Sequence, residues 1–480
     1  MAGYGAPPAA ASTTFTVTRT SDTNDGACTP ADCSLREAVR AANAAAGADV
    51  IVVPAGTYQL TLTGAGENHA ASGDLDITEA VTIRGHGAPT TIVKGLGADR
   101  IFEIRPSTSA TISRLTIRGG NPGDHAGGGI LVSGTLTLRY AVVASNTANG
   151  GGGIFSSGTL TMSRTVVTGN HTVDGSINPD GGGLDLAGPT TIVQSTLSGN
   201  QTSTSDSGET KQGGGIFIMN SSLTIRNSSI EGNSGSYGGG FLSQNASVTL
   251  NNDTIAQNTS RDGTSGGINH FSHDGSEHIT VGNTIVANNT PANCDVTTDT
   301  VDSTGHNLDT GTTCHFTGVG DDQSTPAGLT PLAANGGPTP TIALQTSSLA
   351  VDHGGAGCEA KDQRGVTRPQ GAACEIGAYE LPVAVVTRPT SSTLHHRAFT
   401  FAWNSPGGRA GTASFDVRFH RRTIGASQFG RFHAFLTHTT IRSATFTGDF
   451  GFEYCFSARA VDRGGHPSTF GPERCTEVTH

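Results

Sequence analysis

The chain has 480 residues, 68 of them glycine, and a formal net charge of −11 at pH 7. This length allows two or more domains, and the acidic balance argues against nucleic acid and anionic membrane surfaces as main partners. The glycines keep no three-residue period, which excludes collagen and indicates many turns or an internal repeat. No run of about 18 apolar residues occurs, so we expect no membrane span.

The N-terminal segment divides into a tail and a cap. Residues 1–12 lack the charged and apolar regions of a signal peptide, so we expect a disordered start or an expression remnant. Residues 34–44 form the amphipathic helix that the sequence predicts here, with Ser34 as N-cap and Glu37 completing a capping box. This helix should cover the open end of a solenoid, where the first coil would expose its core.

An internal repeat occupies residues 127–290. Five units open with three glycines and close with an asparagine, and they read GGGILVSGTLTLRYAVVASN, GGGIFSSGTLTMSRTVVTGN, GGGLDLAGPTTIVQSTLSGN, GGGIFIMNSSLTIRNSSIEGN and GGGFLSQNASVTLNNDTIAQN. A degenerate sixth unit opens at Gly266. Each unit holds three short β-branched runs, and stacked units bury equivalent Ile, Leu and Val side chains in continuous rows. The repeat therefore predicts a right-handed parallel β-helix solenoid in an all-β chain.

The closing asparagines share one corner of the predicted coil. There their side-chain amides can hydrogen-bond along the stack, so we assign them a structural and not a catalytic role: Asn146, Asn170, Asn200, Asn233 and Asn258. Shorter strands between residues 81 and 117 should belong to the same helix. We expect the helix to span 13–381, with 291–381 as its C-terminal cap region.

Beyond a linker at 382–390, the sequence changes character. Apolar and polar residues alternate at strand period in residues 391–480, which predicts an immunoglobulin/fibronectin-like β-sandwich. This module would serve as a spacer or for attachment.

The eight cysteines fall into four close pairs in separate segments, without a Cys-x-x-Cys motif. We interpret them as disulfides in preference to a metal site: Cys28/Cys33, Cys294/Cys314, Cys358/Cys374 and Cys455/Cys475. Disulfides place the protein in an oxidising compartment, either secreted or on the cell surface.

Three separated motifs resemble a known family. Cys33–Ala38 spells the CSLREA signature, and 336–341, 362–365 and 375–380 resemble the choice-of-anchor region that follows such helices. Trp403, with Tyr454 beside Cys455, resembles a fibronectin type III-like module of actinobacterial secreted enzymes. The resemblance implies a bacterial surface or secreted β-helix protein and brings no agreed catalytic motif.

Two long insertions, 171–180 and 201–212, follow equivalent corners and should project from one side, which we call the loop face. A pectate-lyase-like reaction would need a carboxylate cluster for calcium and a basic residue to remove a proton. The carboxylate candidates are Asp174, Asp180, Asp185 and Asp206, and the basic candidates are Lys211 and Arg261. Calcium is the cofactor that this reading suggests, and the sequence establishes none.

Strand alternation suggests a second candidate site. If Ile154, Leu184 and Ile216 point inward, the next residues Phe155, Asp185 and Phe217 point outward on successive coils. A carboxylate between two exposed rings suits a sugar chain, because stacking and hydrogen bonding are both available. The alternative is that the long loops cover these rings.

A third candidate is a polar run near the end of the repeat. His270, His273, Asp274, Glu277 and His278 offer ligands for a transition metal. Alternatively, Asp274-Gly275 forms a hairpin turn, which explains the polarity without a metal.

The sequence thus favours a monomeric secreted or cell-surface β-helix protein that engages extracellular polysaccharide or another surface. One alternative is a polysaccharide lyase or glycosidase acting on the 171–212 loop face. The other is a structural stalk that binds no sugar. The sequence does not decide whether the protein is an enzyme.

Overall fold

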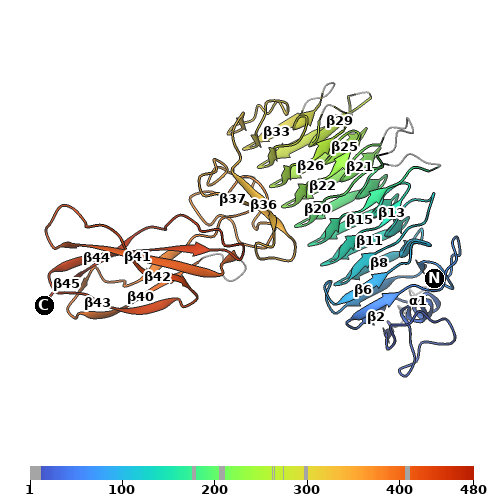
Figure 1. Cartoon of the computed structure of the whole chain (residues 1–480), viewed down its shortest axis with the longest axis horizontal. Helices are drawn as coiled ribbons and strands as arrows, with labels where there is room; N and C mark the ends of the chain where they lie inside the picture. The colour runs from blue at the N-terminus through green and yellow to red at the C-terminus, as the bar shows by residue number, and fades with distance from the viewer. Residues whose placement is uncertain are drawn as a thin grey trace, which may run out of the picture. The chain divides into compact units, whose positions relative to one another are not determined.

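The computed structural model describes residues 12–175, 180–204, 211–261, 263, 265–273, 275–296, 301–405 and 411–480. The chain divides into two compact units, 1–324 and 325–480. The first is a parallel β-helix and the second contains an antiparallel β-sandwich, which confirms the predicted fold class (Figure 1). Residues 325–381, which the sequence analysis grouped with the helix, belong to the same compact unit as the sandwich.

Three parallel sheets form the walls of the β-helix. Sheet A comprises β1 (Thr14–Thr16), β2 (Asp49–Val53), β5 (Val81–Gly85), β8 (Ser109–Ser113), β11 (Thr135–Arg139), β15 (Thr159–Ser163), β19 (Thr190–Val193), β22 (Ser222–Arg226), β26 (Ser247–Asn251), β30 (Ile279–Gly282) and β33 (Val301–Gly305). Sheet B comprises β3 (Gly56–Gln59), β6 (Thr91–Lys94), β9 (Thr116–Arg118), β12 (Val142–Ala144), β16 (Val166–Thr168), β20 (Thr196–Ser198), β23 (Ser229–Glu231), β27 (Thr254–Ala256), β31 (Ile285–Ala287), β34 (Leu308–Asp309) and β35 (Asp322–Gln323).

Sheet C carries the candidate site residues. It comprises β4 (Leu75–Ile77), β7 (Phe102–Ile104), β10 (Ile130–Val132), β14 (Ile154–Ser156), β18 (Leu184–Leu186), β21 (Ile216–Met219), β25 (Phe241–Gln244), β29 (Ile268–Phe271) and β32 (Cys294–Asp295). Between sheets B and C along the chain lie the short strands β13 (Thr147–Ala148), β17 (His171–Thr172), β24 (Ser234–Gly235) and β28 (Thr259–Ser260).

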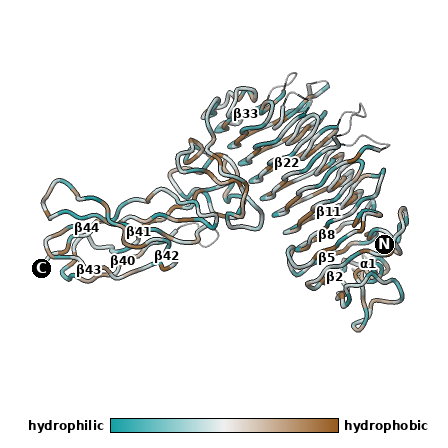
Figure 2. Tube along the Cα trace, viewed as in Figure 1, coloured by the Kyte–Doolittle hydropathy of each residue, from teal (hydrophilic) through white to brown (hydrophobic). Residues whose placement is uncertain are grey.

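The core follows from the register of the repeat. Leu136 pairs with Leu160, and Ile130 with Ile154, so equivalent apolar residues stack and are fully buried. Figure 2 shows these hydrophobic segments recurring from coil to coil along the solenoid. Stacking therefore removes from water the apolar face that a single unit would leave exposed.

The glycine-rich opening of each unit reflects close backbone approach. A Cβ built on Gly152 would lie 2.4 Å from the carbonyl oxygen of His171 and 2.5 Å from that of Gly182. A side chain cannot fit between these backbones, so the repeat requires glycine at this position.

The predicted asparagine ladder is present and buried. Nδ2 of each asparagine donates to Oδ1 of the next, at 2.9 Å from Asn146 to Asn170 and at 3.0 Å from Asn170 to Asn200. The ladder continues beyond Asn258 to Asn289 and Asn293. These bonds satisfy amides that would otherwise be buried without partners.

Helix α1 (Leu35–Ala44) covers the N-terminal end of the β-helix, as predicted (Figure 1). Ser34 is its N-cap, and the capping box with Glu37 is complete. Leu35, Ala38 and Val39 join the hydrophobic core of the coils. The buried guanidinium of Arg36 pairs with Asp22 at 2.7 Å and donates to the carbonyl oxygens of the 70–74 segment.

The second unit combines a β-hairpin with the sandwich. The hairpin joins β36 (Leu329–Ala333) and β37 (Thr341–Leu344). The sandwich sheets are β38 (Val385–Arg388), β40 (Ala398–Asn404) and β43 (Ser443–Thr447), and β39 (Thr393–Leu394), β45 (Arg474–Val478), β44 (Phe452–Val461), β41 (Ser414–Thr423) and β42 (His433–Thr439). The hydroxyl of Tyr379 donates to Asp462, which links the 325–381 segment to the sandwich.

All four predicted disulfides form, linking Cys28 to Cys33, Cys294 to Cys314, Cys358 to Cys374 and Cys455 to Cys475. They fit an extracellular, oxidising environment. In the part of the chain that the structure describes, none of the helices has the length and apolar character needed to span a membrane.

Candidate functional site

The loop face begins with a row of residues that directly follow the corner asparagines. Thr147, His171, Gln201, Ser234 and Thr259 lie in register on successive coils. Because neighbouring strands are about 4.8 Å apart, the row repeats at that interval along the helix axis. The signal for this row in the sequence is the position directly after each corner asparagine.

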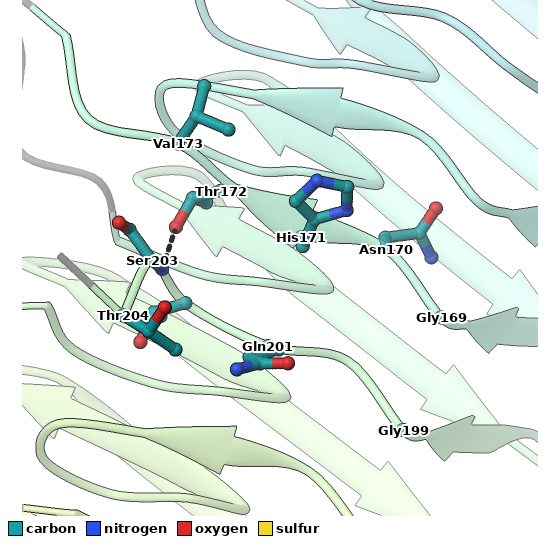
Figure 3. Close-up of a pocket in the computed structure, with 10 residues that line it drawn as sticks. Gly169, Asn170, His171, Thr172, Val173, Gly199, Gln201, Ser203 and Thr204 are labelled. Atoms are coloured by element: carbon teal, nitrogen blue, oxygen red, sulfur yellow. Dashed lines mark hydrogen bonds between the residues drawn. The ribbon is translucent and has the colours of Figure 1, made fainter.

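A polar pocket of about 410 Å³ opens on this row. Its lining includes His171, Thr172, Gln201, Thr202, Ser203 and Thr204, which come from two adjacent coils (Figure 3). Ser203 N–H donates to the hydroxyl of Thr172 at 3.1 Å, which joins the two coils within the pocket. An imidazole, an amide and several hydroxyls thus surround a space within the size range of ligand sites.

The predicted basic residues of the loop face are already engaged. Lys211 is 2% exposed, and its Nζ lies 3.2 Å from Oδ1 of Asp174. The guanidinium of Arg261 donates to the carbonyl oxygens of Thr202 and Ser203 at 3.2 and 2.6 Å. Arg261 therefore holds the backbone beside the pocket. Asp206, the fourth predicted carboxylate, lies outside the described residues.

On sheet C, Asp185 lies between the two neighbours that the sequence predicts for it. Phe155 pairs with Asp185 on one side, and Phe217 pairs with it on the other. Phe155 is half-buried, but Phe217 is only 5% exposed. The expectation of two exposed stacking rings is therefore wrong for Phe217, whose ring is covered by its surroundings.

Two carboxylates of this region have raised pKa values. Burial raises the pKa of Asp180 to about 6, against the opposing effect of Gln212 N–H, which donates to it at 2.8 Å. Burial among protein atoms, together with the charge of Asp180, raises the pKa of Asp185 well above its usual value, although Asp185 retains some surface. Asp185 therefore holds a proton more strongly than an ordinary aspartate, as a general acid requires.

The predicted histidine-rich metal site is not assembled among its described members. His270 points into the helix core, where Nδ1 lies 2.5 Å from the hydroxyl of Ser243. Glu277 accepts from the hydroxyl of Ser272 at 2.7 Å, and His278 faces Asp302 at 3.7 Å. His273 is exposed, and Asp274 lies outside the described residues. Strand alternation turns the His270 ring inward, where Nε2 lies 3.2 Å from the backbone carbonyl oxygen of Glu277.

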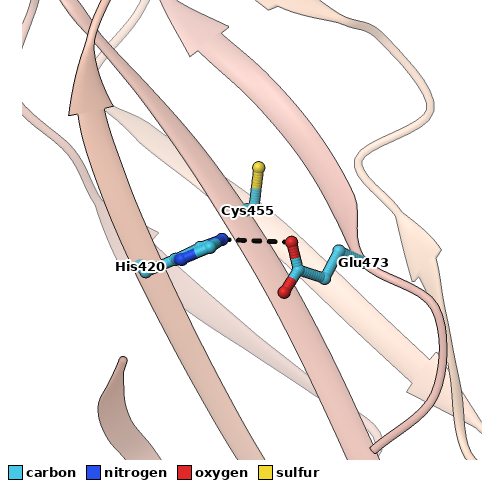
Figure 4. Close-up of side chains that lie close together, drawn as sticks. All are labelled: His420, Cys455 and Glu473. Atoms are coloured by element: carbon cyan, nitrogen blue, oxygen red, sulfur yellow. Dashed lines mark hydrogen bonds and ion pairs between the residues drawn. The ribbon is translucent and has the colours of Figure 1, made fainter. Parts of the chain in front are cut away.

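A second cluster of possible ligands lies in the sandwich. His420 Nε2 lies 3.0 Å from Glu473 Oε2, close to Cys455 (Figure 4). Cys455 is bonded to Cys475, so its sulfur is no thiolate ligand. The ring of His420 instead stacks between Phe429 and Phe432, at centroid distances of 4.3 and 4.2 Å.

Fold and site together define a disulfide-bonded parallel β-helix protein with a polar pocket on one face. No family model matches the chain, and no curated protein matches it. Among solved structures, the A-module of a mannuronan C-5 epimerase from Azotobacter vinelandii aligns over 60% of this chain and 90% of its own, with 15% identity and a TM-score of 0.30.

The catalytic domain of a GH87 α-1,3-glucanase in complex with tetrasaccharides aligns over 57% of this chain and 67% of its own, with 12% identity and a TM-score of 0.18. A myokine structure aligns over 21% of this chain and 97% of its own, with 16% identity and a TM-score of 0.16. Similarities at these TM-scores carry no argument about function, which must come from the site itself.

Proposed function

We propose that this protein is a secreted or cell-surface β-helix protein that binds an extracellular polysaccharide along the loop face. The observation that carries the proposal is the polar pocket over His171 and Gln201. Sugar hydroxyls need convergent donors and acceptors, and imidazole, amide and hydroxyl groups supply them. The pocket sits on a row that repeats from coil to coil, which suits a ligand that is itself a linear repeat.

The charges favour a neutral polysaccharide. The two cations of this region, Lys211 and Arg261, already contact protein groups, so their charges are engaged within the protein. A polyanion would need a positively charged surface or a bridging cation, whereas a neutral polysaccharide needs only hydrogen-bond donors and acceptors.

Retention on immobilised polysaccharides tests the proposal. The double variant His171→Ala/Gln201→Ala removes the two largest polar groups of the pocket, and we expect the dissociation constant to rise at least about tenfold. The matched control is Thr161→Ala/Thr191→Ala, which changes the outer row of sheet A on the same two coils. Retention of no polysaccharide would favour the stalk, and equal weakening by both double variants would place binding elsewhere.

The carboxylate pair favours a second candidate, in which the bound polysaccharide is also cleaved. A protonated Asp185 beside Asp180 has the character of an acid–base pair in a glycosidase or lyase. New reducing ends, or the ultraviolet absorbance of an unsaturated uronate, would report cleavage. We expect Asp185→Asn to abolish product and Asp302→Asn, at an exposed carboxylate, to leave it unchanged. Binding without product would leave the first proposal standing alone.

We also infer that the chain belongs with the CSLREA-type surface proteins, on the motif at Cys33–Ala38. In this chain the motif has a structural use, because Arg36 and Glu37 hold the N-terminal cap. The sandwich would then be the attachment module. Deletion of the whole second unit, residues 325–480, should reduce retention on the producing cell's wall without changing the affinity of the loop face for soluble polysaccharide.

A further inference from the structure

Three buried carboxylates converge at the N-terminal end of sheet C, far along the chain from the loop face. Asp76 on β4 pairs with Glu103 on β7, so both side chains lie on the same face of the sheet. Asp74 stands two residues before Asp76, in the bend that leads into β4. Asp74, Asp76 and Glu103 are 1%, 0% and 6% exposed, and one carboxylate oxygen of each lies within 4.8 Å of the others.

The surrounding charges do not balance. Asp99, whose Oδ2 accepts from Asp74 N–H at 3.3 Å, adds a fourth carboxylate. Arg100 Nη1 lies 3.3 Å from Asp74 and 3.1 Å from Glu103, and Arg105 contacts Glu103. Two guanidinium groups thus face four carboxylates, and Glu67 adds a further negative charge close to Asp76. Buried charges without compensation are strongly unfavourable.

One carboxylate oxygen of Asp76 is left without a hydrogen bond in this cluster. Its Oδ2 accepts from Ala70 N–H at 2.9 Å, whereas its Oδ1 is buried and has no hydrogen-bond partner. Among the described residues, the ion pairs of the two arginines go to Asp74 and Glu103 and not to Asp76. A fully buried carboxylate oxygen without a partner calls for an unseen ligand.

The cap holds these carboxylates in place. The guanidinium of Arg36 donates to the carbonyl oxygens of Ala70, Gly73 and Asp74, and it is itself paired with Asp22. Asp99 fixes the backbone from the other side through Asp74 N–H. The three carboxylates are therefore supported by a rigid frame before any ligand arrives, as a preorganised ion site requires.

We propose that Asp74, Asp76 and Glu103 bind one calcium ion, which joins the first two strands of sheet C, β4 and β7. Carboxylate oxygens are the ligands of hard cations, and at Ca–O distances of about 2.3–2.6 Å two ligand oxygens of one ion lie at most about 5 Å apart. A charge of +2 offsets two of the three negative charges by which Glu67 and the four carboxylates exceed the two arginines. Magnesium keeps several waters, so an enclosed site of protein oxygens favours calcium.

Metal content and thermal unfolding of the full-length protein test this site. The protein is dialysed against EGTA and returned to buffer with calcium, with magnesium or without either, and bound metal is measured by mass spectrometry. We expect one calcium per chain and a rise in Tm of at least about 3 °C with calcium. Asp76→Asn should lose both responses, and Glu79→Gln, which changes an exposed carboxylate three residues away, should keep them.

The metal-free state provides an independent readout. Without calcium, Asp76→Asn should unfold at the same temperature as the unmodified protein or at a higher one, because it removes a buried charge without a partner. Glu103→Gln serves as a second variant if Asp76→Asn fails to fold. The proposal is overturned if the unmodified protein binds no calcium, or if both site variants bind it as the unmodified protein does. The calcium proposal does not depend on polysaccharide binding, which the variant His171→Ala/Gln201→Ala tests separately.

Discussion

The side-chain amide of Asn170 donates to Oδ1 of Asn200 at 3.0 Å, inside a corner that excludes water. Asn200 in turn donates to the carbonyl oxygen of Val167 and to Oδ1 of Asn233. Each asparagine thus joins three coils, and the loss of one leaves polar groups buried on both sides.

We therefore expect Asn200→Ala to lower the free energy of unfolding of the β-helix by about 3–5 kcal/mol, since each buried group left unsatisfied costs about 1–3 kcal/mol. Urea unfolding followed by far-ultraviolet circular dichroism measures this loss. Gln201→Ala changes the adjacent, exposed amide and should alter stability by less than about 0.5 kcal/mol. Equal effects of the two variants would mean that the ladder contributes little.

The buried pair between Arg36 and Asp22 gives a second prediction. Both side chains are almost fully buried, so Arg36→Ala leaves the charge of Asp22 without its partner. We expect a loss of about 3–5 kcal/mol, as for other broken buried pairs. Arg40→Ala, on the exposed side of the same helix, should cost less than about 1 kcal/mol in the same urea titration. A small effect of Arg36→Ala would show that the cap does not support the coils.

The raised pKa of Asp180 predicts that the stability of the protein depends on pH. Its folded pKa of about 6 exceeds its usual value of 3.8, so the folded state binds the proton more tightly than the unfolded state. The contribution of Asp180 to stability is therefore most favourable below pH 3.8 and declines as the pH rises to about 6.

Asp180→Asn should remove this decline. The stability of the variant relative to the unmodified protein should rise between pH 4 and pH 7, by up to about 3 kcal/mol. Chemical unfolding at a series of pH values measures the difference. A difference that does not change with pH would mean that Asp180 ionises in the folded protein as it does in water.

The disulfide between Cys455 and Cys475 closes a segment with a sequence separation of 20, which gives a fourth prediction. Replacing both cysteines with alanine should lower the stability of the second unit by about 3 kcal/mol, through the added freedom of the unfolded chain. Trp403 is the only tryptophan of the chain and is buried in the sandwich, so its fluorescence reports this unit alone. The unfolding transition of the β-helix, followed by circular dichroism, should keep the same midpoint.

Several candidate-site features were accessible from the sequence because they depend on strand period. Alternation correctly placed Phe155, Asp185 and Phe217 on adjacent coils. The same rule, applied from Ile268, turns His270 inward, whereas His273 is exposed. The strands Leu75–Ile77 and Phe102–Ile104 each carry one acidic residue between two apolar ones, and their register places Asp76 beside Glu103 on one face.

The sequence by itself determined the coil, the asparagine ladder, the helical cap and the four disulfides, because each depends on local spacing that repeats or lies within a short segment. Only the tertiary structure decided that Phe217 is covered, that burial and the charge of Asp180 raise the pKa of Asp185, and that Asp74, Asp76 and Glu103 converge. It also decided that residues 325–381 join the sandwich unit. The physical reason is that burial and charge at one coil depend on side chains and loops from other coils, whose positions no local period specifies.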